Sequence, residues 1–239
     1  MWRKLIWKEW CEQRWRLAFG CVLFGGFTLI GLSTRMMEDE MVIAFGLIFG
    51  APLMVLLTSM APLAGEREEG TMAVLVALPL RPWKILLVKT LMAVAVCLAP
   101  LVVILAVTLA VAGDRELTFR RILEFHALSM GFSAMLLVWS LAFGARMATE
   151  ARAALVTLAV AAFWCISFMA LGMSLDIVRR DGNHEALLAL GSLHPMGGIR
   201  EGPFRACPTW LWAVVQSAIM AGLWLWTARR WTRLGGRAA

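Results

Sequence analysis

Long stretches without a charged residue dominate the chain and alternate with short polar segments. Six of these stretches contain no Asp, Glu, Lys or Arg: residues 17–32, 41–65, 90–113, 127–145, 153–175 and 206–228. A helix needs about 20 apolar residues to cross the ~30 Å hydrocarbon core of a membrane. Backbone amides in lipid need partners within their own segment, and the alternation typical of barrel strands is missing, so the stretches predict helices. The sequence therefore predicts an all-α membrane protein with six transmembrane helices, at about 17–33, 41–64, 85–112, 126–145, 153–175 and 208–228.

The first 16 residues carry a mixed pattern that predicts a separate helix. The apolar arc of its helical wheel holds Trp2, Leu5, Ile6 and Trp10. Glu9 falls inside this arc and breaks the pattern, whereas most other charges lie opposite. We expect residues 1–16 to lie on the inner membrane surface as an amphipathic interfacial helix. Seven charges, two of them acidic, and the lack of a small-residue cleavage site argue against a cleaved signal peptide.

The segment between the second and third spans is the most informative polar stretch. Residues 65–71 read Gly-Glu-Arg-Glu-Glu-Gly-Thr, and the apolar residues 72–78 follow. Thr71 is a suitable N-cap, and Pro79 ends a helix because proline lacks the amide hydrogen. The pattern predicts a charged turn and a two-turn amphipathic helix. Such a helix docks on a soluble partner or lies in the membrane interface as an ordinary loop helix.

Two further polar segments complete the predicted organisation. The loop 176–205 contains an apolar stretch of eight residues, 186–193, which is too short to cross a membrane. This stretch predicts a short re-entrant-like helix at the outer face before the last span, or a loop packed on the surface. Residues 229–239 form a basic tail after the last span.

Composition supports the membrane reading. Apolar residues make up 61% of the 239-residue chain and charged residues 16%, whereas soluble domains average about 45–50% and about 25%. These values exclude a disordered chain and an ordinary soluble domain. Five cysteines, an odd and small number, also exclude a disulfide scaffold.

The positive charges predict how the chain is oriented. If the N-terminus is cytoplasmic, 15 of the 23 Lys and Arg residues fall on the inner side. Positive residues favour the cytoplasmic side, so we expect a multi-pass protein of the cytoplasmic (inner) membrane with both termini cytoplasmic. The net charge of +7 then matches an anionic inner leaflet, and no nucleic-acid partner needs to be invoked.

Motifs for catalysis or metal binding are missing. The chain has no P-loop, Gly-x-Ser-x-Gly, His-Glu-x-x-His or Cys-x-x-Cys sequence, so we expect no catalytic residue, cofactor or metal in it. His126 begins the fourth span and is best read as a polar cap. His184, His194 and Cys207 share one loop region, but their spacing does not support a metal site.

The charge-free stretches also bear on the energy source. Ion-coupled transporters usually carry ionisable residues within their spans. None of the six stretches contains Asp, Glu, Lys or Arg. If the protein moves a substrate uphill, the energy must therefore come from another subunit.

Residues 65–89 resemble the membrane subunits of ATP-binding-cassette exporters of the ABC type-2 permease family. The matching residues are Glu66, Arg67, Gly70, Thr71, Leu75, Leu78, Pro79 and Lys89. Ala73 and Val88 depart from the family's usual acidic residue and glycine. The Trp7-Lys8-Glu9 sequence before the first span, the six spans and the short outer helix extend the resemblance to nearly the whole chain.

The resemblance implies a half-transporter. Two permease chains, identical or related, would form the translocation path, and a separate cytoplasmic ATPase would bind ATP and Mg. The loop 65–84 would couple the two subunits, with Glu66 and Arg67 contacting the ATPase or tying the coupling helix to the N-terminal one. The coupling residues implied in this way are Glu66, Arg67, Glu69, Gly70, Thr71, Leu75 and Pro79. Export is implied by the family alone.

Two other function classes stay open at this stage. One is a non-catalytic membrane scaffold or assembly factor. The other is a membrane-embedded lipid-modifying enzyme, for which His126 is the one ionisable candidate near a span. The substrate is also open, because apolar spans with a few hydroxyl groups suit a lipid, an amphipathic drug, a peptide or a glycan.

Overall fold

The protein consists of helices throughout the part that the structure describes. The computed structural model describes residues 2–34, 38–59, 64–71, 75, 80–112, 119–147, 149–180 and 209–235. The helices are α1 (Trp2–Thr34), α2 (Asp39–Ser59), α3 (Glu66–Glu68), α5 (Pro82–Ala112), α6 (Phe119–Gly144), α7 (Glu150–Arg180) and α9 (Thr209–Gly235). None of the described residues lies in a strand. The all-α prediction is confirmed for these residues.

Among the residues that the structure describes, five helices are long and apolar enough to cross a membrane. Their apolar parts are Trp2–Thr34, Pro82–Val111, Ile122–Gly144, Glu150–Ser167 and Leu211–Arg230. The second predicted span coincides over most of its length with α2, a helix of 21 residues. That α2 also crosses, which would make six spans, stays a prediction.

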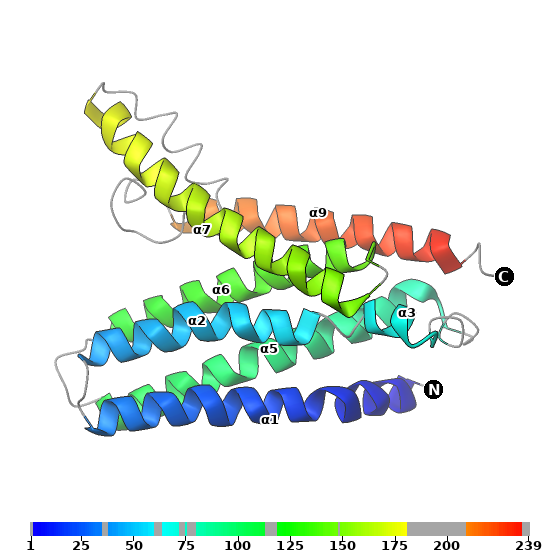
Figure 1. Cartoon of the computed structure of the whole chain (residues 1–239), viewed down its shortest axis with the longest axis horizontal. Helices are drawn as coiled ribbons and strands as arrows, with labels where there is room; N and C mark the ends of the chain where they lie inside the picture. Colours follow the sequence, from blue (N-terminus) through cyan, green and yellow to red (C-terminus); the bar gives the residue numbers. More distant parts are fainter. Residues whose placement is uncertain are drawn as a thin grey trace.

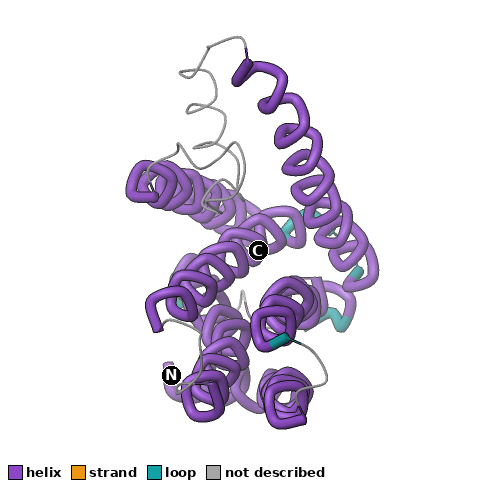
Figure 2. The backbone as a smooth tube through the Cα atoms, turned by 90° about the vertical axis from the view of Figure 1, so that its left-hand side faces the viewer, coloured by secondary structure: helices purple, strands orange, loops and turns teal. Residues whose placement is uncertain are grey.

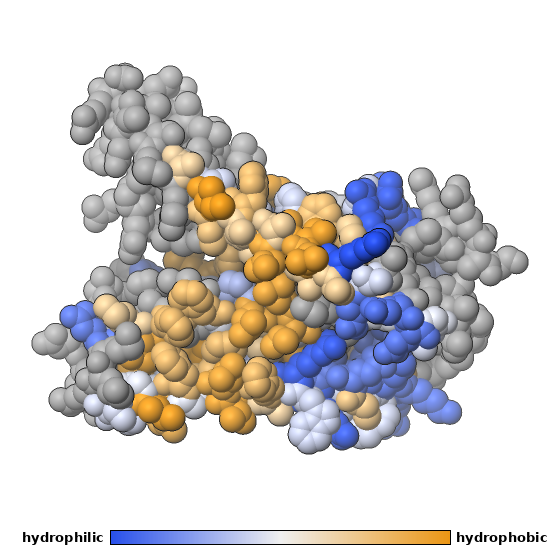
Figure 3. All heavy atoms as spheres, in the orientation of Figure 1, coloured by the Kyte–Doolittle hydropathy of each residue, from blue (hydrophilic) through white to orange (hydrophobic). Residues whose placement is uncertain are grey.

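The long helices run alongside one another, and both ends of the chain lie at the same end of the bundle (Figure 1). We call this the charged end. It carries the first turns of α1, the α3 region, the turn after α6 at 145–147 and the last turns of α9. Hydrophilic side chains gather there, whereas apolar side chains cover the middle of the bundle (Figure 3). This arrangement follows from the alternation of charge-free stretches and polar segments in the sequence.

The apolar core lies mostly between α1, α2, α5 and α6, and α7 and α9 add Trp164 and Trp212 to it. Its fully buried members include Leu32, Met54, Leu101 and Leu136. Gly20 permits the close approach of α1 to its neighbours, because a Cβ atom at this position would lie 2.4 Å from Met54 Sδ and 2.9 Å from Pro100 Cγ. A larger residue would therefore require the Met54 side chain and the Pro100 ring to shift.

The first predicted boundary differs from the structure. Residues 1–16 were expected as a helix separate from the first span, but α1 is continuous from Trp2 to Thr34 (Figure 1). The physical reason is local. Residues 2–19 contain neither proline nor glycine, and Glu9 and Gln13 are buried on the same stripe as Gly20. That residues 1–16 lie at the membrane surface stays a prediction.

α7 diverges from the bundle toward its C-terminal end. Figures 1 and 2 both show it leaving the group formed by the other long helices. Several of its apolar side chains are more than half exposed: Leu155, Leu158, Phe163 and Ile166. α7 also continues to Arg180, beyond the predicted span end at 175. The predicted helix 186–193 lies outside the described residues.

Candidate functional site

Glu66 is buried at the charged end and links three parts of the chain. It is the first residue of α3, and only 4% of its surface is exposed. Its carboxylate oxygen Oε1 accepts hydrogen bonds from Lys8 Nζ at 2.5 Å and from Lys89 Nζ at 2.8 Å. Lys8 belongs to α1 and Lys89 to α5. A single side chain therefore ties the loop after α2 to two long helices.

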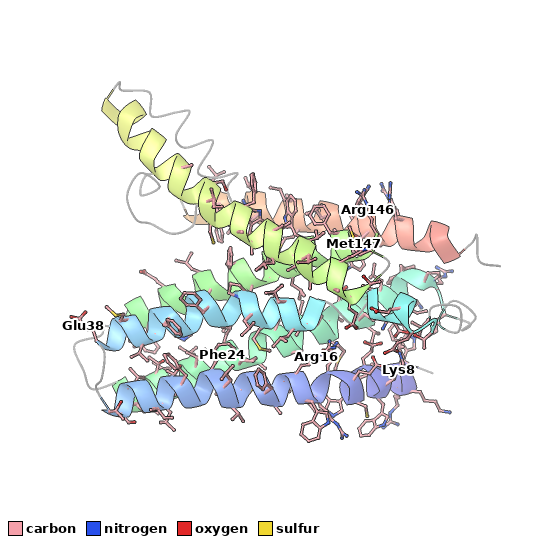
Figure 4. The ribbon with its side chains drawn as sticks, in the orientation of Figure 1. Lys8, Arg16, Phe24, Glu38, Arg146 and Met147 are labelled. Carbon is pink, nitrogen blue, oxygen red and sulfur yellow. The ribbon has the colours of Figure 1, made fainter. Side chains whose placement is uncertain are left out.

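Lys89 extends this contact into a larger cluster. It also donates to Glu9 Oε1 at 2.5 Å, and Lys89 and Glu9 are each 1% exposed. Lys8 in turn pairs with Glu12 at 3.0 Å, at the exposed edge. We call these five residues the ion cluster; Figure 4 labels Lys8 beside the α3 region.

The ion cluster explains the break in the amphipathic pattern of α1. Glu9 lies one helical turn from Leu5 and one from Gln13, and all three are buried. The stripe on which they lie faces other helices instead of lipid, and α5 supplies Lys89 as the partner of Glu9. Sequence reasoning did not assign Lys8, Glu12 or Lys89 to the site. The available signal was a carboxylate in an apolar arc and a lysine directly before a charge-free stretch.

Electrostatics hold Glu66 in its charged form. Burial on its own would raise the pKa of Glu66, but the attraction of Lys89 and the hydrogen bonds from Lys8, Lys89 and Thr71 outweigh it. Together they lower the pKa from 4.5 to about 2. A buried charge that loses its partner costs about 3–5 kcal/mol. The cluster is therefore stable as a unit and costly to take apart.

Three carboxylates of the cluster lie close enough to hold a metal ion. Ligand oxygens of Glu9, Glu12 and Glu66 all lie within 4.8 Å of one another. However, each of these side chains already pairs with Lys8 or Lys89. The ammonium groups supply the positive charge that the carboxylates require, so the arrangement is best described as a salt-bridge network.

The chain turns sharply after α3. Glu69 N donates a hydrogen bond to Gly65 O at 2.9 Å, which closes the turn before Gly70. Gly70 has a φ of 71°, in the left-handed region that favours glycine. A new helical turn then begins, since Leu75 N donates to Thr71 O at 3.1 Å. The Thr71 hydroxyl donates to the Glu66 carboxylate. Gly70 thus ends the preceding turn, and Thr71 supports Glu66.

Leu75 anchors this region from the apolar side. It is 4% exposed and packs with Leu5 of α1 and with Ile85 and Val88 of α5. The elements that meet here are the same ones that meet in the ion cluster. The rest of the predicted amphipathic helix, residues 72–74 and 76–79 with Pro79, lies outside the described residues.

Glu68 makes a second connection, to α7. Its Oε2 accepts a hydrogen bond from the backbone N of Glu150, the first residue of α7, at 2.8 Å. An acceptor at this position satisfies one of the amide donors that a helix leaves open at its N-terminus. The backbone at Gly65 also lies close to the Glu150 side chain, because a Cβ atom at Gly65 would lie 2.3 Å from Glu150 Oε1.

We call residues 64–71 the α3 segment. It contacts α1, α5 and α7 through Glu66 and Glu68, and it exposes Glu68, Glu69 and Gly70. The predicted coupling residues therefore divide into two groups. Glu66, Thr71 and Leu75 face the protein, and Glu69 and Gly70 face outward. The side chain of Arg67 lies outside the described part, and the coupling role of the whole set stays a prediction.

The predicted residues of the first helix divide in the same way. Leu5 and Glu9 are buried. Trp2, Ile6 and Trp10 are exposed by 37%, 44% and 38%, as expected for side chains that face lipid or headgroups.

His126, the predicted polar cap, is buried by the protein, and its place at the membrane interface stays a prediction. It is 1% exposed, and its Nδ1 lies 2.8 Å from Ile122 O. Its Nε2 is buried and has no hydrogen-bond partner among the described residues. Within that part of the chain it therefore has no carboxylate or nucleophile with which to form a catalytic pair. His184, His194 and Cys207 lie outside the described residues.

A known family matches most of the chain. The family model described as ABC-2 family transporter protein matches residues 25–228. The match includes Glu66, Lys89 and the α3 segment, whereas residues 1–24 precede it. No curated protein matches the chain.

Proposed function

Because the chain belongs to the ABC-2 family of transporter membrane proteins, we propose that it is the permease subunit of an ATP-binding-cassette exporter. A component of this family is not itself catalytic, and the family implies association with an ATP-binding-cassette ATPase. ATP and Mg are bound by that ATPase in our proposal. This chain contributes the membrane path and the element that receives the movement.

The double attachment of the α3 segment carries the coupling proposal. Glu66 links it to α1 and α5, and Glu68 links it to the N-terminus of α7. The ATPase docks on the exposed residues Glu68, Glu69 and Gly70. When ATP closes the ATPase, the segment moves, and the buried ion pairs move α1 and α5 with it because separating them is costly. A two-state element biased by ATP is all that this mechanism requires.

Two permease chains enclose the path in this proposal. The exposed apolar face of α7, with Leu155, Leu158, Phe163 and Ile166, offers a surface for the second chain or for lipid. Both termini lie at the charged end, which faces the cytoplasm of a bacterial-type inner membrane. The direction of transport follows from the proposed exporter class.

The test separates docking from coupling. The chain is co-expressed with its cognate ATP-binding-cassette ATPase and reconstituted in proteoliposomes, and both ATPase binding and ATP hydrolysis are measured. We expect Glu69→Lys to weaken ATPase binding, because this side chain is exposed and its charge is reversed. Glu66→Gln should retain binding but lose most of the permease-dependent ATP hydrolysis.

Glu12→Gln is the matched control, since Glu12 belongs to the same ion cluster but lies at its exposed edge. It should leave both readouts near the unmodified protein. Normal ATP hydrolysis in Glu66→Gln would show that the buried attachment does not transmit the movement. Normal binding in Glu69→Lys would show that the ATPase docks elsewhere.

A further inference from the structure

Two arginines stack on one tryptophan at the charged end, away from the ion cluster. The guanidinium carbon of Arg146 lies 4.4 Å from the ring centroid of Trp226, and that of Arg230 lies 5.0 Å from it. Arg230 follows Trp226 by one turn of α9, but Arg146 comes from the turn after α6. The tertiary fold is therefore what brings the second cation to the ring, and Figure 4 shows Arg146 beside α9.

The turn that carries Arg146 is well defined. Arg146 N donates to Phe143 O at 2.8 Å, and Met147 N donates to Gly144 O at 3.1 Å. These bonds close the end of α6 and direct the chain toward α7. Arg146 is thus held in place by the hydrogen bonds of its turn and by the Trp226 ring. Binding of a ligand to Arg146 therefore costs less conformational entropy.

Neither guanidinium is neutralised by a carboxylate in the described part of the chain. The four ion pairs found there all involve Lys8 or Lys89, on α1 and α5. Arg146, Trp226 and Arg230 are all at least one-third exposed. Two positive charges are therefore held close together at an open surface and retain their capacity to bind an anion.

The position of Arg146 and Arg230 in the bundle indicates which class of anion they bind. Trp226 lies near the end of the predicted last span, beside the exposed Leu225, and the apolar surface gives way to hydrophilic surface toward this end (Figure 3). Tryptophan at such a boundary is typical of the headgroup level. α9 continues to Gly235 beyond the pair, so the cations face the side of the bundle rather than its tip.

Guanidinium groups bind phosphate with two parallel hydrogen bonds, and lysine does not offer this geometry. We propose that Arg146 and Arg230, held on Trp226, form a binding site for the phosphate of an anionic phospholipid, whose acyl chains lie along the apolar surface of α9. The occupant is a lipid of the leaflet at the charged end. This site is independent of the α3 segment and of ATPase binding.

Native mass spectrometry of the full chain, released from mixed micelles of phosphatidylglycerol and phosphatidylcholine, tests the proposal. We expect one tightly retained phosphatidylglycerol on the unmodified protein. The double variant Arg146→Gln/Arg230→Gln should weaken its apparent binding about tenfold, which corresponds to about 1.4 kcal/mol, because the attraction of two cations is lost. Trp226→Leu should weaken it as well, because the ring positions both guanidinium groups.

Arg3→Gln/Arg14→Gln is the matched control. It removes the same charge from exposed positions at the same end, and Arg14 also lies over a tryptophan, 5.7 Å from the ring of Trp15. This variant should retain the lipid. Equal loss in both double variants would show that the net charge of the surface attracts the lipid, and retention in Arg146→Gln/Arg230→Gln would show that the lipid binds elsewhere. Either result overturns the proposal.

A competition with inorganic phosphate distinguishes a lipid from a soluble anion. The acyl chains add apolar contacts that inorganic phosphate lacks. We therefore expect phosphatidylglycerol to remain bound when millimolar inorganic phosphate is added. Displacement would assign the site to a soluble phosphate compound and overturn the lipid proposal.

Discussion

Glu9 and Lys89 are the two most deeply buried charges of the ion cluster, each 1% exposed. Glu9 belongs to α1 and Lys89 to α5, so each charge finds its partner on another helix and none within its own. Replacing a buried ion pair by apolar residues is often neutral, whereas removing one partner leaves an uncompensated charge. At the residue scale the pair therefore contributes to the specificity of packing between α1 and α5 more than to the net stability of the protein.

A double-mutant cycle checks this at Glu9 and Lys89. Lys89→Met alone should destabilise the protein by about 3–5 kcal/mol, because it leaves the buried Glu9 carboxylate unpaired. Glu9→Leu alone should destabilise it less, because Lys89 keeps Glu66 as a partner. The double variant should lie within about 2 kcal/mol of the unmodified protein. Thermal unfolding in detergent measures all four proteins. If the double variant is as unstable as the sum of the two single ones, the pair is not coupled as described.

The sequence contained part of this information. The position of Glu9 inside an apolar arc was visible, and a buried partner is the physical reason for such a break. Lys89 was visible as a member of a family pattern and as the lysine before a charge-free stretch, but neither signal pointed to Glu9. Its partners lie 80 and 23 residues away, and local spacing carries no signal for contacts of that separation.

At the element scale the helices follow the sequence pattern closely. The predicted spans 85–112 and 153–175 fall within α5 and α7. The boundary at residue 16 was wrong as a helix end, because a change from amphipathic to apolar composition does not break a helix when no proline or glycine intervenes. The αL conformation of Gly70 was also missed: the pattern predicted a charged turn followed by a helix from Thr71, and it did not indicate that Gly70, with a φ of 71°, ends the preceding turn.

The hydrogen bond between Glu68 and the Glu150 amide predicts how the start of α7 responds to a change in the α3 segment. Glu68→Ala removes the acceptor of the Glu150 amide and should cost about 1 kcal/mol, as the loss of an N-terminal cap does. The first turn of α7 should then exchange its amide hydrogens faster, measured by hydrogen–deuterium exchange. Glu69→Ala is the control, since Glu69 is exposed and makes no described contact with α7. Unchanged exchange in Glu68→Ala would mean that the bond does not hold α7.

At the scale of the whole molecule, the two polar ends of the bundle are unlike. The charged end gathers the ion cluster, the α3 segment and the Arg146–Trp226–Arg230 stack, and both termini leave the bundle there (Figure 1). The sequence predicted this grouping from charge alone, because positive residues concentrate in alternate polar segments. It did not predict that α7 diverges from the other helices, since the apolar stretch of α7 resembles the rest.

Reporter fusions test the predicted orientation of the whole chain. A fluorescent protein that matures only in the cytoplasm should be bright at both the N-terminus and the C-terminus. A phosphatase that is active only outside should be inactive at both positions and active when inserted after residue 115. Phosphatase activity at either terminus would reverse the assignment of the charged end to the cytoplasm.

The ion cluster also constrains the order in which the protein is made. Glu9 leaves the ribosome 80 residues before Lys89, and Glu66 leaves it 23 residues before Lys89. Until α5 is synthesised, Glu9 lacks the lysine that it pairs with in the finished protein, and a lone carboxylate avoids lipid. The first helix must therefore keep this end in contact with water while α2 and the α3 segment follow. Arrival of α5 then completes the cluster, so α1 reaches its final packing only after α5, the third long helix, has entered the membrane.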